Sequence, residues 1–303
     1  MFEATDYLPR SRDPEGPDVR FSYSRPEQRW FNRTMIRLIE RASGQPHLEE
    51  LYRGWSANPP PGENIFSAAT RLLGIDIDTP AEAWARIPKH GPVLFIANHP
   101  FGVIDGLLMG HLATRARPDT KLLTHSLLCQ APEARDFLLP VDFGGTPKAA
   151  QTSALTRRRT VDWLRGGHAV AIFPAGSVST SQRPFKGPAL DAPWHPFVAK
   201  LALLPHVTVI PVCFHGQNSR MFQAVSHVHY ALRIALLFRE TRRRAGTRIA
   251  VSVGEPITAT ELADLGSREN VVRELRRRTL LLQGPGGPDP DQAFLWPAHI
   301  SFD

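Results

Sequence analysis

Short apolar runs alternate along the chain with longer segments in which apolar residues recur every three or four positions. The runs predict strands, and the longer segments predict helices. Strands are expected at 93–96, 120–123, 169–173, 208–214 and 248–253. Helices are expected at 65–74, 105–116, 148–166, 193–204, 217–244 and 260–283. This alternation predicts an α/β fold, with a mixed, mostly parallel sheet flanked by helices.

The N-terminal part has a different pattern. Residues 1–27 are rich in proline and charge and lack periodicity, which is typical of an irregular arm. An apolar helix face follows, formed by Trp30, Phe31, Thr34, Met35, Leu38 and Ile39. A second helix is expected from about Pro46 to Arg53. We therefore divide the chain into an arm with a helical N-terminal subdomain (1–63), an α/β domain (64–283) and a C-terminal extension (284–303).

Composition limits the kinds of partner that the protein can bind and argues against a disulfide-rich protein. The chain has 303 residues, 42% of them hydrophobic, which is enough for a large core. Its net charge of +7 favours an anionic partner: nucleic acid, phospholipid or a phosphorylated small molecule. Without a recognised module, charge alone is weak evidence for nucleic acid, and none is expected as a partner. Two cysteines in apolar stretches argue against a disulfide framework.

The longest apolar runs are much shorter than the roughly 20 residues that span a bilayer, and the first 20 residues have no apolar core typical of a signal peptide. We therefore expect peripheral association with an anionic membrane surface, at the cytoplasmic face of the inner membrane.

The densest group of polar residues directly follows the strand at 93–96. It reads NHPFGVIDG over residues 98–106, with His99 and Asp105 as the chemical groups. Ligands of open α/β sheets bind beyond the carboxyl ends of the strands. A histidine oriented by a carboxylate is an effective base for an alcohol that attacks a thioester. The alternative is structural, with His99 ending the strand and Asp105 capping the next helix.

Two further blocks follow later strands: FPAGSVST at 173–180 and VIPVCFHGQNSRMF at 209–222. In this order, the three blocks resemble the lysophospholipid and glycerolipid acyltransferase family, and more narrowly its haemolysin-like bacterial branch. The resemblance covers about residues 90–280. It implies a peripheral O-acyltransferase that moves a fatty acyl group from acyl-CoA or acyl carrier protein to a lysophospholipid or a lyso-aminolipid such as lyso-ornithine lipid. No resident cofactor and no metal are expected.

The sequence departs from the family pattern at two places. Five residues separate His99 from Asp105, where many members have four, and Gly102 can absorb the extra residue through a positive φ. Ala175 and Val178 stand where the family usually has Glu and Arg, which are associated with the acceptor and its phosphate. A different acceptor head group is therefore expected.

Candidate substrate-binding residues come from all three blocks and from nearby cations, which can hold a phosphate or carboxylate. They are Asn98, Phe101, Gly102, Lys148, Gly176, Ser177, Ser179, Arg183, Lys186, His215, Asn218 and Arg220. Backbone N–H groups at Phe101–Val103 or Gly176 are candidates for the oxyanion. For each residue the alternative is a structural role: a turn, a helix cap or a solvated charge.

The segment from Tyr230 to Arg244 combines an apolar run with a cluster of arginines. It fits either a helix lying on an anionic bilayer or a core helix with a basic C-terminal end. Two other functions also stay open: a non-catalytic lipid-binding protein with the same fold, and acylation of an amine or a protein-linked acceptor. Motifs of hydrolases, NTPases and dinucleotide enzymes do not occur.

Overall fold

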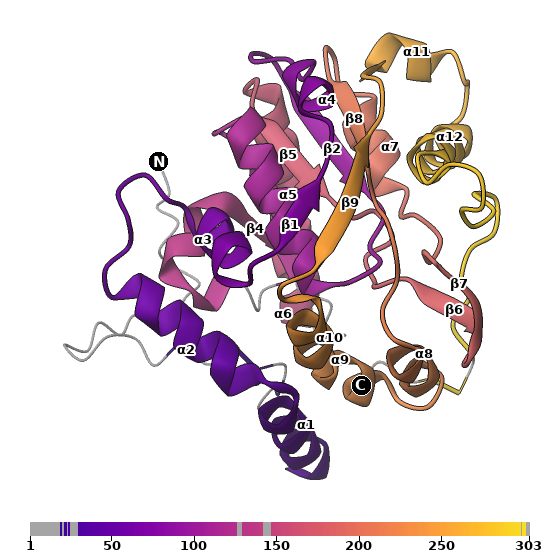
Figure 1. Ribbon diagram of the computed structural model, residues 1–303. Helices are drawn as coiled ribbons and strands as arrows, with labels where there is room; N and C mark the ends of the chain where they lie inside the picture. The colour runs from indigo at the N-terminus through magenta and orange to yellow at the C-terminus, as the bar shows by residue number, and fades with distance from the viewer. Residues whose placement is uncertain are drawn as a thin grey trace.

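The computed structural model describes residues 19, 21–22, 24, 30–125, 129–141, 147–297 and 299–300. Within them a central sheet is flanked by helices (Figure 1). The strands are β1 (Asp76–Asp78), β2 (Val93–Ala97), β3 (Lys121–His125), β4 (Leu138–Val141), β5 (Ala169–Ile172), β6 (Thr180–Arg183), β7 (Lys186–Leu190), β8 (Thr208–Phe214), β9 (Arg248–Val253) and β10 (Ile257–Thr258).

The main sheet has the order β1-β9-β8-β2-β5-β3-β4, and β10 pairs with β8. Strands β8, β2, β5, β3 and β4 run parallel. Strands β9 and β10 run antiparallel to β8, and β1 runs parallel to β9. The predicted mixed, mostly parallel sheet is confirmed.

Helices cover both faces of this sheet. The α-helices are α1 (Trp30–Ser43), α2 (Gln45–Ser56), α3 (Ile65–Leu72), α4 (Ala81–Ala85), α5 (Val103–Ala116), α6 (Pro147–Arg165), α7 (Phe197–Ala202), α8 (Arg220–Ser226), α9 (Tyr230–Ala235), α10 (Leu237–Arg244), α11 (Ala259–Ala263) and α12 (Arg268–Leu281), and a 3-10 helix, η2, spans Pro132–Phe137. None of the described helices combines the length and the apolar character needed to cross a membrane.

The central strand β2 shows why the sheet is buried on both sides. All five of its side chains are buried, and successive side chains point to opposite faces. Phe95 packs with α3 and α5, whereas Leu94 and Ile96 pack with α6, α7 and α12. The continuous apolar run that predicted this strand is therefore a consequence of its two covered faces.

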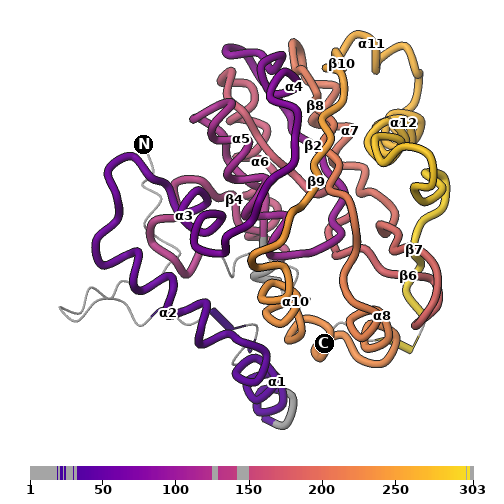
Figure 2. Tube along the Cα trace, in the orientation of Figure 1, coloured from indigo at the N-terminus to yellow at the C-terminus, as the bar shows by residue number. Residues whose placement is uncertain are grey.

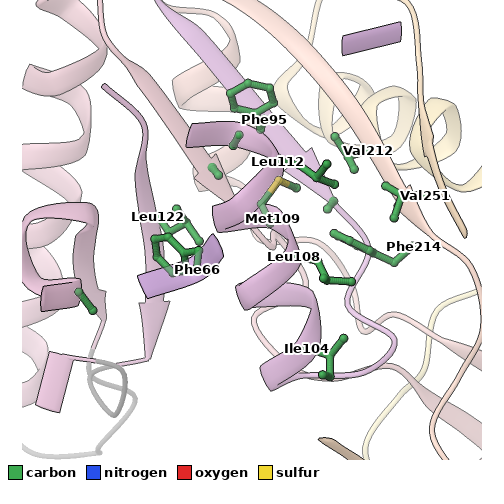
Figure 3. Close-up of a cluster of buried hydrophobic side chains, with 14 of the residues drawn as sticks. Phe66, Phe95, Ile104, Leu108, Met109, Leu112, Leu122, Val212, Phe214 and Val251 are labelled. Carbon is green, nitrogen blue, oxygen red and sulfur yellow. The ribbon is translucent and has the colours of Figure 1, made fainter. Parts of the chain in front are cut away.

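Figure 3 shows the core on the α5 side of the sheet, where Ile104, Leu108, Met109 and Leu112 of α5 lie near the sheet residues Phe95 and Val212. Gly110 permits a close approach of α3. A Cβ at this position would lie 2.4 Å from the ring of Phe66. The close packing of α3 against α5 thus fixes the direction in which α5 leaves the sheet.

The N-terminal helices lie at one end of the molecule. Helix α1 packs against α9 and α10, and α2 packs against α3. Figure 2 shows how segments far apart in the sequence meet here, with the indigo α1 near the orange α10. The proposed boundaries at residues 63 and 283 stay predictions.

Two predicted helices are divided in the structure. The segment 217–244 forms α8, α9 and α10, because the side chain of His229 accepts a hydrogen bond from Ala231 N–H and starts a new helix. The segment 260–283 forms α11 and α12, and Ser267 caps the second. Helix α7 begins only at Phe197, four residues later than expected.

The division changes the interpretation of the segment Tyr230–Arg244. Its apolar residues Leu236, Leu237 and Phe238 are buried. Arg233 is buried as well, and its guanidinium bonds to Ser226 Oγ, Thr180 Oγ1 and the Val178 carbonyl. Burial lowers the pKa of Arg233 to about 10. The apolar side of this segment belongs to the core, so the structure favours the core-helix alternative over a helix lying on a bilayer.

Candidate active site

Three loops gather at one edge of the sheet, because β2, β5 and β8 are parallel neighbours and their carboxyl ends meet there. We call them the His99 loop (98–106), the serine loop (173–179) and the His215 loop (215–219). The serine loop is held to the His99 loop by Ser179 N–H, which donates to the His99 carbonyl at 2.8 Å. The three sequence blocks are thus brought together.

The predicted contact between His99 and Asp105 is present. Nδ1 of His99 lies 3.0 Å from Oδ2 of Asp105. The same oxygen accepts hydrogen bonds from the N–H groups of Phe101 at 2.7 Å and Gly102 at 2.9 Å. The Asp105 side chain is fully buried, whereas that of His99 keeps 17% of its surface exposed.

Gly102 allows this contact despite the extra residue in the loop. It has φ +87°, a conformation that L-residues with side chains rarely adopt. A Cβ there would lie 2.9 Å from Cδ2 of Leu237 and 3.0 Å from Cγ2 of Val178. The role predicted for Gly102 in shaping the loop is confirmed. Its Cα faces protein side chains, and its assignment to substrate binding stays a prediction.

The orientation of the imidazole suits proton transfer. The ring stacks on Phe173, with centroids 4.4 Å apart and an interplanar angle of 29°. With Nδ1 directed at Asp105, Nε2 is the ring atom left for a substrate, and none of the described groups hydrogen-bonds to it. Nδ1 lies within ion-pair distance of Oδ2 but makes no hydrogen bond of good geometry in the structure. In the imidazolium form this contact becomes an ion pair, so the two side chains are arranged to act as a base.

The environment of Asp105 is electrostatically unusual. Burial raises the pKa of its carboxyl above the ordinary value, although His99 and the two backbone N–H groups oppose the shift. Its other oxygen, Oδ1, is buried and has no hydrogen-bond partner among the described residues. When ionised, this carboxylate lies where it would stabilise positive charge on the His99 ring.

Asp191 was not predicted from the sequence, and its carboxylate holds the backbone of His99 in place. Its Oδ1 accepts from His99 N–H at 3.2 Å and from Ser179 Oγ at 2.5 Å, and its Oδ2 accepts from Trp194 Nε1 at 3.0 Å. The side chain is 1% exposed. The sequence did contain a signal that could have pointed to this residue, because Asp191 is the only acidic residue between Trp163 and Arg239. An isolated acid in a basic, apolar stretch is a candidate for a buried structural charge.

Several residues expected to bind substrate make structural contacts, and their substrate roles stay predictions. The amide of Asn98 is 2% exposed and exchanges two hydrogen bonds with the backbone of Phe214, so it ties β2 to β8. Phe101 is buried, and its ring lies under the guanidinium of Arg244. Asn218 is buried and donates to the Phe101 carbonyl at 3.3 Å.

The remaining residues of the serine and His215 loops differ in how exposed they are and in whether their side chains already bond to other protein groups. Gly176 is exposed and Ser177 is partly exposed, so both stay predictions as substrate contacts. Ser179 is buried and donates to Asp191, which makes it a positioning residue. His215 pairs with Ser252 Oγ at 2.8 Å, and burial lowers its pKa. That hydrogen bond turns His215 toward β9.

The candidate cations do not join the His99 loop. Arg183 and Lys186 are exposed on the β6–β7 hairpin, which was not predicted. Arg220 is exposed too and donates to the Gly187 carbonyl of the same hairpin at 2.7 Å. Lys148 belongs to the first turn of α6, and its side chain lies outside the described part of the structure.

An apolar cavity of about 110 Å³ lies beside the His99 loop. Val103 and Leu107 of α5 form part of its wall, together with Phe238 of α10 and apolar side chains of α2 and α3. Val103 lies within the His99 loop, so the loop contributes directly to the wall of the cavity. For a metal, by contrast, no group of three His, Cys, Asp or Glu side chains is suitably placed within the described residues.

A parallel sheet with a His–Asp pair at its carboxyl edge and an apolar cavity beside it has the features of an acyl-transfer enzyme. The chain belongs to an acyltransferase family, because residues 27–285 match the family described as "Acyltransferase".

Two relatives are lyso-glycine lipid O-acyltransferases. The protein of Phocaeicola vulgatus is 24% identical over 203 residues, covering 65% of this chain and 69% of its own. That of Bacteroides thetaiotaomicron is 25% identical over 208 residues, covering 65% and 71%. Among solved structures, the 1-acyl-sn-glycerophosphate acyltransferase PlsC of Thermotoga maritima matches with a TM-score of 0.43 and 16% identity, over 84% of this chain and 86% of that chain.

Proposed function

We propose that this acyltransferase moves a fatty acyl group from an acyl thioester to a hydroxyl group of a lysolipid. The observation that carries the proposal is the contact between His99 and the buried carboxylate of Asp105, with Nε2 left for the incoming hydroxyl. Nε2 takes the hydroxyl proton as the oxygen attacks the thioester carbon, and Asp105 stabilises the imidazolium that forms. Collapse of the tetrahedral intermediate expels the thiolate, which takes the proton from His99.

The oxyanion needs donors that are not already used. Phe101 N–H and Gly102 N–H bind Asp105, and Gly176 N–H donates to the Phe173 carbonyl. These three expected donors are therefore committed elsewhere. Val103 is the first residue of α5, and the first N–H groups of a helix have no partner within the helix. Among the candidates named from the sequence, we assign the oxyanion to the Val103 N–H, which the positive end of the helix dipole reinforces.

The acceptor we favour is a lyso-aminolipid. Val178 is buried and packs against Leu237, near Phe222, so a charged side chain at this position would be costly. Ala175 is partly buried beside the core of the α6 and α7 face. The phosphate-binding charges of this block are thus replaced by apolar packing. The names of the two relatives agree with an acceptor that carries an amino-acid head group.

The apolar cavity supports the choice of a fatty acyl substrate. Its wall joins the His99 loop through Val103, and its lining is almost entirely apolar. Removing methylene groups from water is favourable by about 0.8 kcal/mol each. The donor is acyl-CoA or acyl carrier protein.

The test is an acyl-transfer assay on the purified protein. Labelled acyl-CoA and acyl carrier protein are each offered with lyso-glycine lipid, lyso-ornithine lipid and lysophosphatidate, and products are identified by mass spectrometry. We expect transfer to a lyso-aminolipid and a loss of about 10³-fold or more in His99→Ala. His168→Ala, which changes a histidine at the other edge of the sheet, is the matched control and should stay within about threefold.

The outcome that contradicts the mechanism is a His99→Ala variant with wild-type turnover. Lipid binding without any transfer by the unmutated protein would instead favour the non-catalytic alternative. Transfer to lysophosphatidate in preference to the lyso-aminolipids would reject the proposed acceptor and leave the His99 chemistry intact.

A further inference from the structure

The β6–β7 hairpin extends outward directly from the serine loop. Its tip exposes Phe185, with 71% of its surface accessible, between the exposed cations Arg183 and Lys186. A single exposed aromatic side chain is ordinary, so what matters here is whether other apolar and charged side chains lie around it. The hairpin starts at Thr180, next to Ser179, which is bonded to the His99 carbonyl and to Asp191. Hydrogen bonds of Ser179 therefore connect the base of the hairpin to the His99 loop.

Neighbouring elements hold the hairpin in place. Gln223 of α8 accepts from Ser181 N–H at 2.9 Å, and Arg220 of α8 donates to the Gly187 carbonyl. The chain after α12 is attached too, since Gln182 Nε2 donates to the Ala293 carbonyl at 2.8 Å. Figure 1 shows the hairpin and α8 on the side of the molecule opposite α4 and α11.

The same elements expose further apolar side chains. Met221 on α8 is 41% exposed, Val228 just after α8 is 69% exposed, and Leu295 in the C-terminal segment is 68% exposed. They come from three separate parts of the chain that are joined by the bonds above and by His299 Nε2, which contacts the His227 carbonyl at 2.9 Å. We call the set Phe185, Met221, Val228 and Leu295, with Arg183, Lys186 and Arg220, the hairpin face.

Cations outnumber acids around the hairpin face. Between Trp163 and Arg239 the only acidic residue is Asp191, which is buried and accepts from the His99 N–H. The hairpin and α8 therefore contribute cations and no exposed acid, whereas the C-terminal segment before Leu295 carries the exposed acids Asp289 and Asp291. The surface of the hairpin and α8 is complementary to an anionic partner.

We propose that the hairpin face docks on an anionic lipid bilayer, with Phe185 inserted among the lipid head groups and Arg183, Lys186 and Arg220 on their phosphates. The apolar side chains are spread over a hairpin, a helix and an extended segment, and this spacing suits a broad, deformable surface better than the groove of one protein. Cations next to an exposed aromatic residue are a combination found at membrane interfaces. Docking does not depend on acyl transfer. Only the further statement, that a lysolipid acceptor enters near the serine loop, rests on the proposed function.

Vesicle binding of the full chain tests the proposal. Partitioning is measured on vesicles of phosphatidylcholine and phosphatidylglycerol in equal amounts, and on phosphatidylcholine alone. Each cation near an anionic surface contributes about fivefold to binding, so Arg183→Gln/Lys186→Gln should weaken partitioning by about 20-fold. Phe185→Ser should weaken it by several-fold more. Arg273→Gln/Arg277→Gln on α12 removes the same charge from exposed positions and should change it by less than about twofold.

A fluorescent label locates the contact. Cys129 and Cys213 are buried, and burial raises the pKa of their thiols to about 11 and about 12, so a cysteine at an exposed position is labelled selectively. A polarity-sensitive dye on Phe185→Cys should shift to the blue when anionic vesicles are added. The same dye on Leu281→Cys, which is 49% exposed on α12, should not.

Three results would overturn the docking proposal: no binding of the unmutated protein to anionic vesicles, equal losses in the hairpin and α12 variants, or a dye at position 185 that responds to acyl carrier protein and not to vesicles. The last would reassign the face to a protein partner. None of these depends on acyl transfer, and failure of the transfer assay would leave the vesicle measurements unaffected.

Discussion

Two histidine–aspartate pairs lie at opposite ends of the parallel strands, one at the carboxyl ends and the other at the amino ends. His99 follows β2 and lies 3.0 Å from Asp105, whereas His168 precedes β5 and lies 3.2 Å from Asp119. The surroundings differ more than the distances. The side chains of the first pair are 17% and 0% exposed, and those of the second are 40% and 31% exposed.

The second aspartate is already neutralised. Arg117 donates to both oxygens of Asp119 at 2.9 and 2.7 Å, and His168 stacks on Trp163. Arg117 and His168 outweigh burial and lower the pKa of Asp119, whereas burial dominates at Asp105 and raises its pKa. A short contact alone therefore does not make a base. Among the described residues, Asp105 makes no ion pair with Arg or Lys, whereas Asp119 is already paired with Arg117.

The largest expected difference concerns the two carboxylates. Asp105→Asn should lower turnover by about 10³-fold, because the amide cannot stabilise an imidazolium. The fold should tolerate the change, since Asn keeps an acceptor for the Phe101 and Gly102 amides and places its NH2 where Oδ1 lacks a partner. Asp119→Asn should leave turnover within about twofold and lower the free energy of unfolding by about 1–2 kcal/mol.

Acyl-transfer assays and chemical denaturation measure the two effects. Equal turnover in the two variants would remove the distinction between the pairs. So would a loss of activity in Asp105→Asn that is fully explained by unfolding.

The pH dependence sharpens the same contrast. The proposed mechanism needs ionised Asp105, so kcat/KM should fall as the pH drops through the raised pKa of this carboxyl, above the ordinary range near 4. The native state binds this proton more tightly than the unfolded chain. Ionisation of Asp105 therefore lowers stability as the pH rises between the ordinary and the raised pKa. For Asp119, whose pKa is lowered, the stabilising contribution is present above the ordinary pKa and is lost as the pH falls through the folded value.

A pH series of initial rates and unfolding midpoints, with Asp105→Asn as the reference, separates these contributions. The acid decrease in kcat/KM should be absent from the residual activity of the variant. Its persistence at the same pH would assign the titration to another group.

A smaller effect is expected from the support behind the pair. Asp191→Asn should lower kcat by on the order of tenfold while the KM for the acceptor stays unchanged, because Asp191 positions the His99 backbone and does not touch the substrate. Trp194→Phe removes only the donor to Oδ2 and is the matched control. A rise in KM without a fall in kcat would contradict a positioning role, as would equal effects of both variants.

The sequence predicted the parts of the fold that rest on continuous apolar runs. Strands β2, β5 and β8 are buried on both faces, so their composition is distinctive. The β6–β7 hairpin escaped prediction because residues 180–190, TSQRPFKGPAL, contain two prolines and show no apolar alternation. The divisions within 217–244 were also missed, since no glycine or proline marks them between Arg220 and Arg244, and a histidine provides the cap.

The site was predictable where it is local in sequence. His99, Gly102 and Asp105 lie within seven residues, and turn geometry links them directly. Asp191 is 92 residues away from His99 and meets it only through the fold. The substrate roles expected of Asn98, Phe101 and Asn218 stay predictions, and the structure adds a loop-building role that the sequence could not show. A polar or aromatic residue beside a reactive histidine is as useful for holding the loop as for touching a substrate, and only burial distinguishes the two uses.

The C-terminal segment reaches this support as well. The Phe294 N–H donates to the carbonyl of Asp191 at 3.0 Å, and the Phe294 ring is buried against Trp296 and His227. Residues 294–296 thus support Asp191, which in turn contacts the backbone of His99. A shortened protein that stops before Phe294, or a fusion that pulls this stretch away, would carry an intact sheet and an intact His99 loop, yet would have lost one of the contacts that keep them aligned.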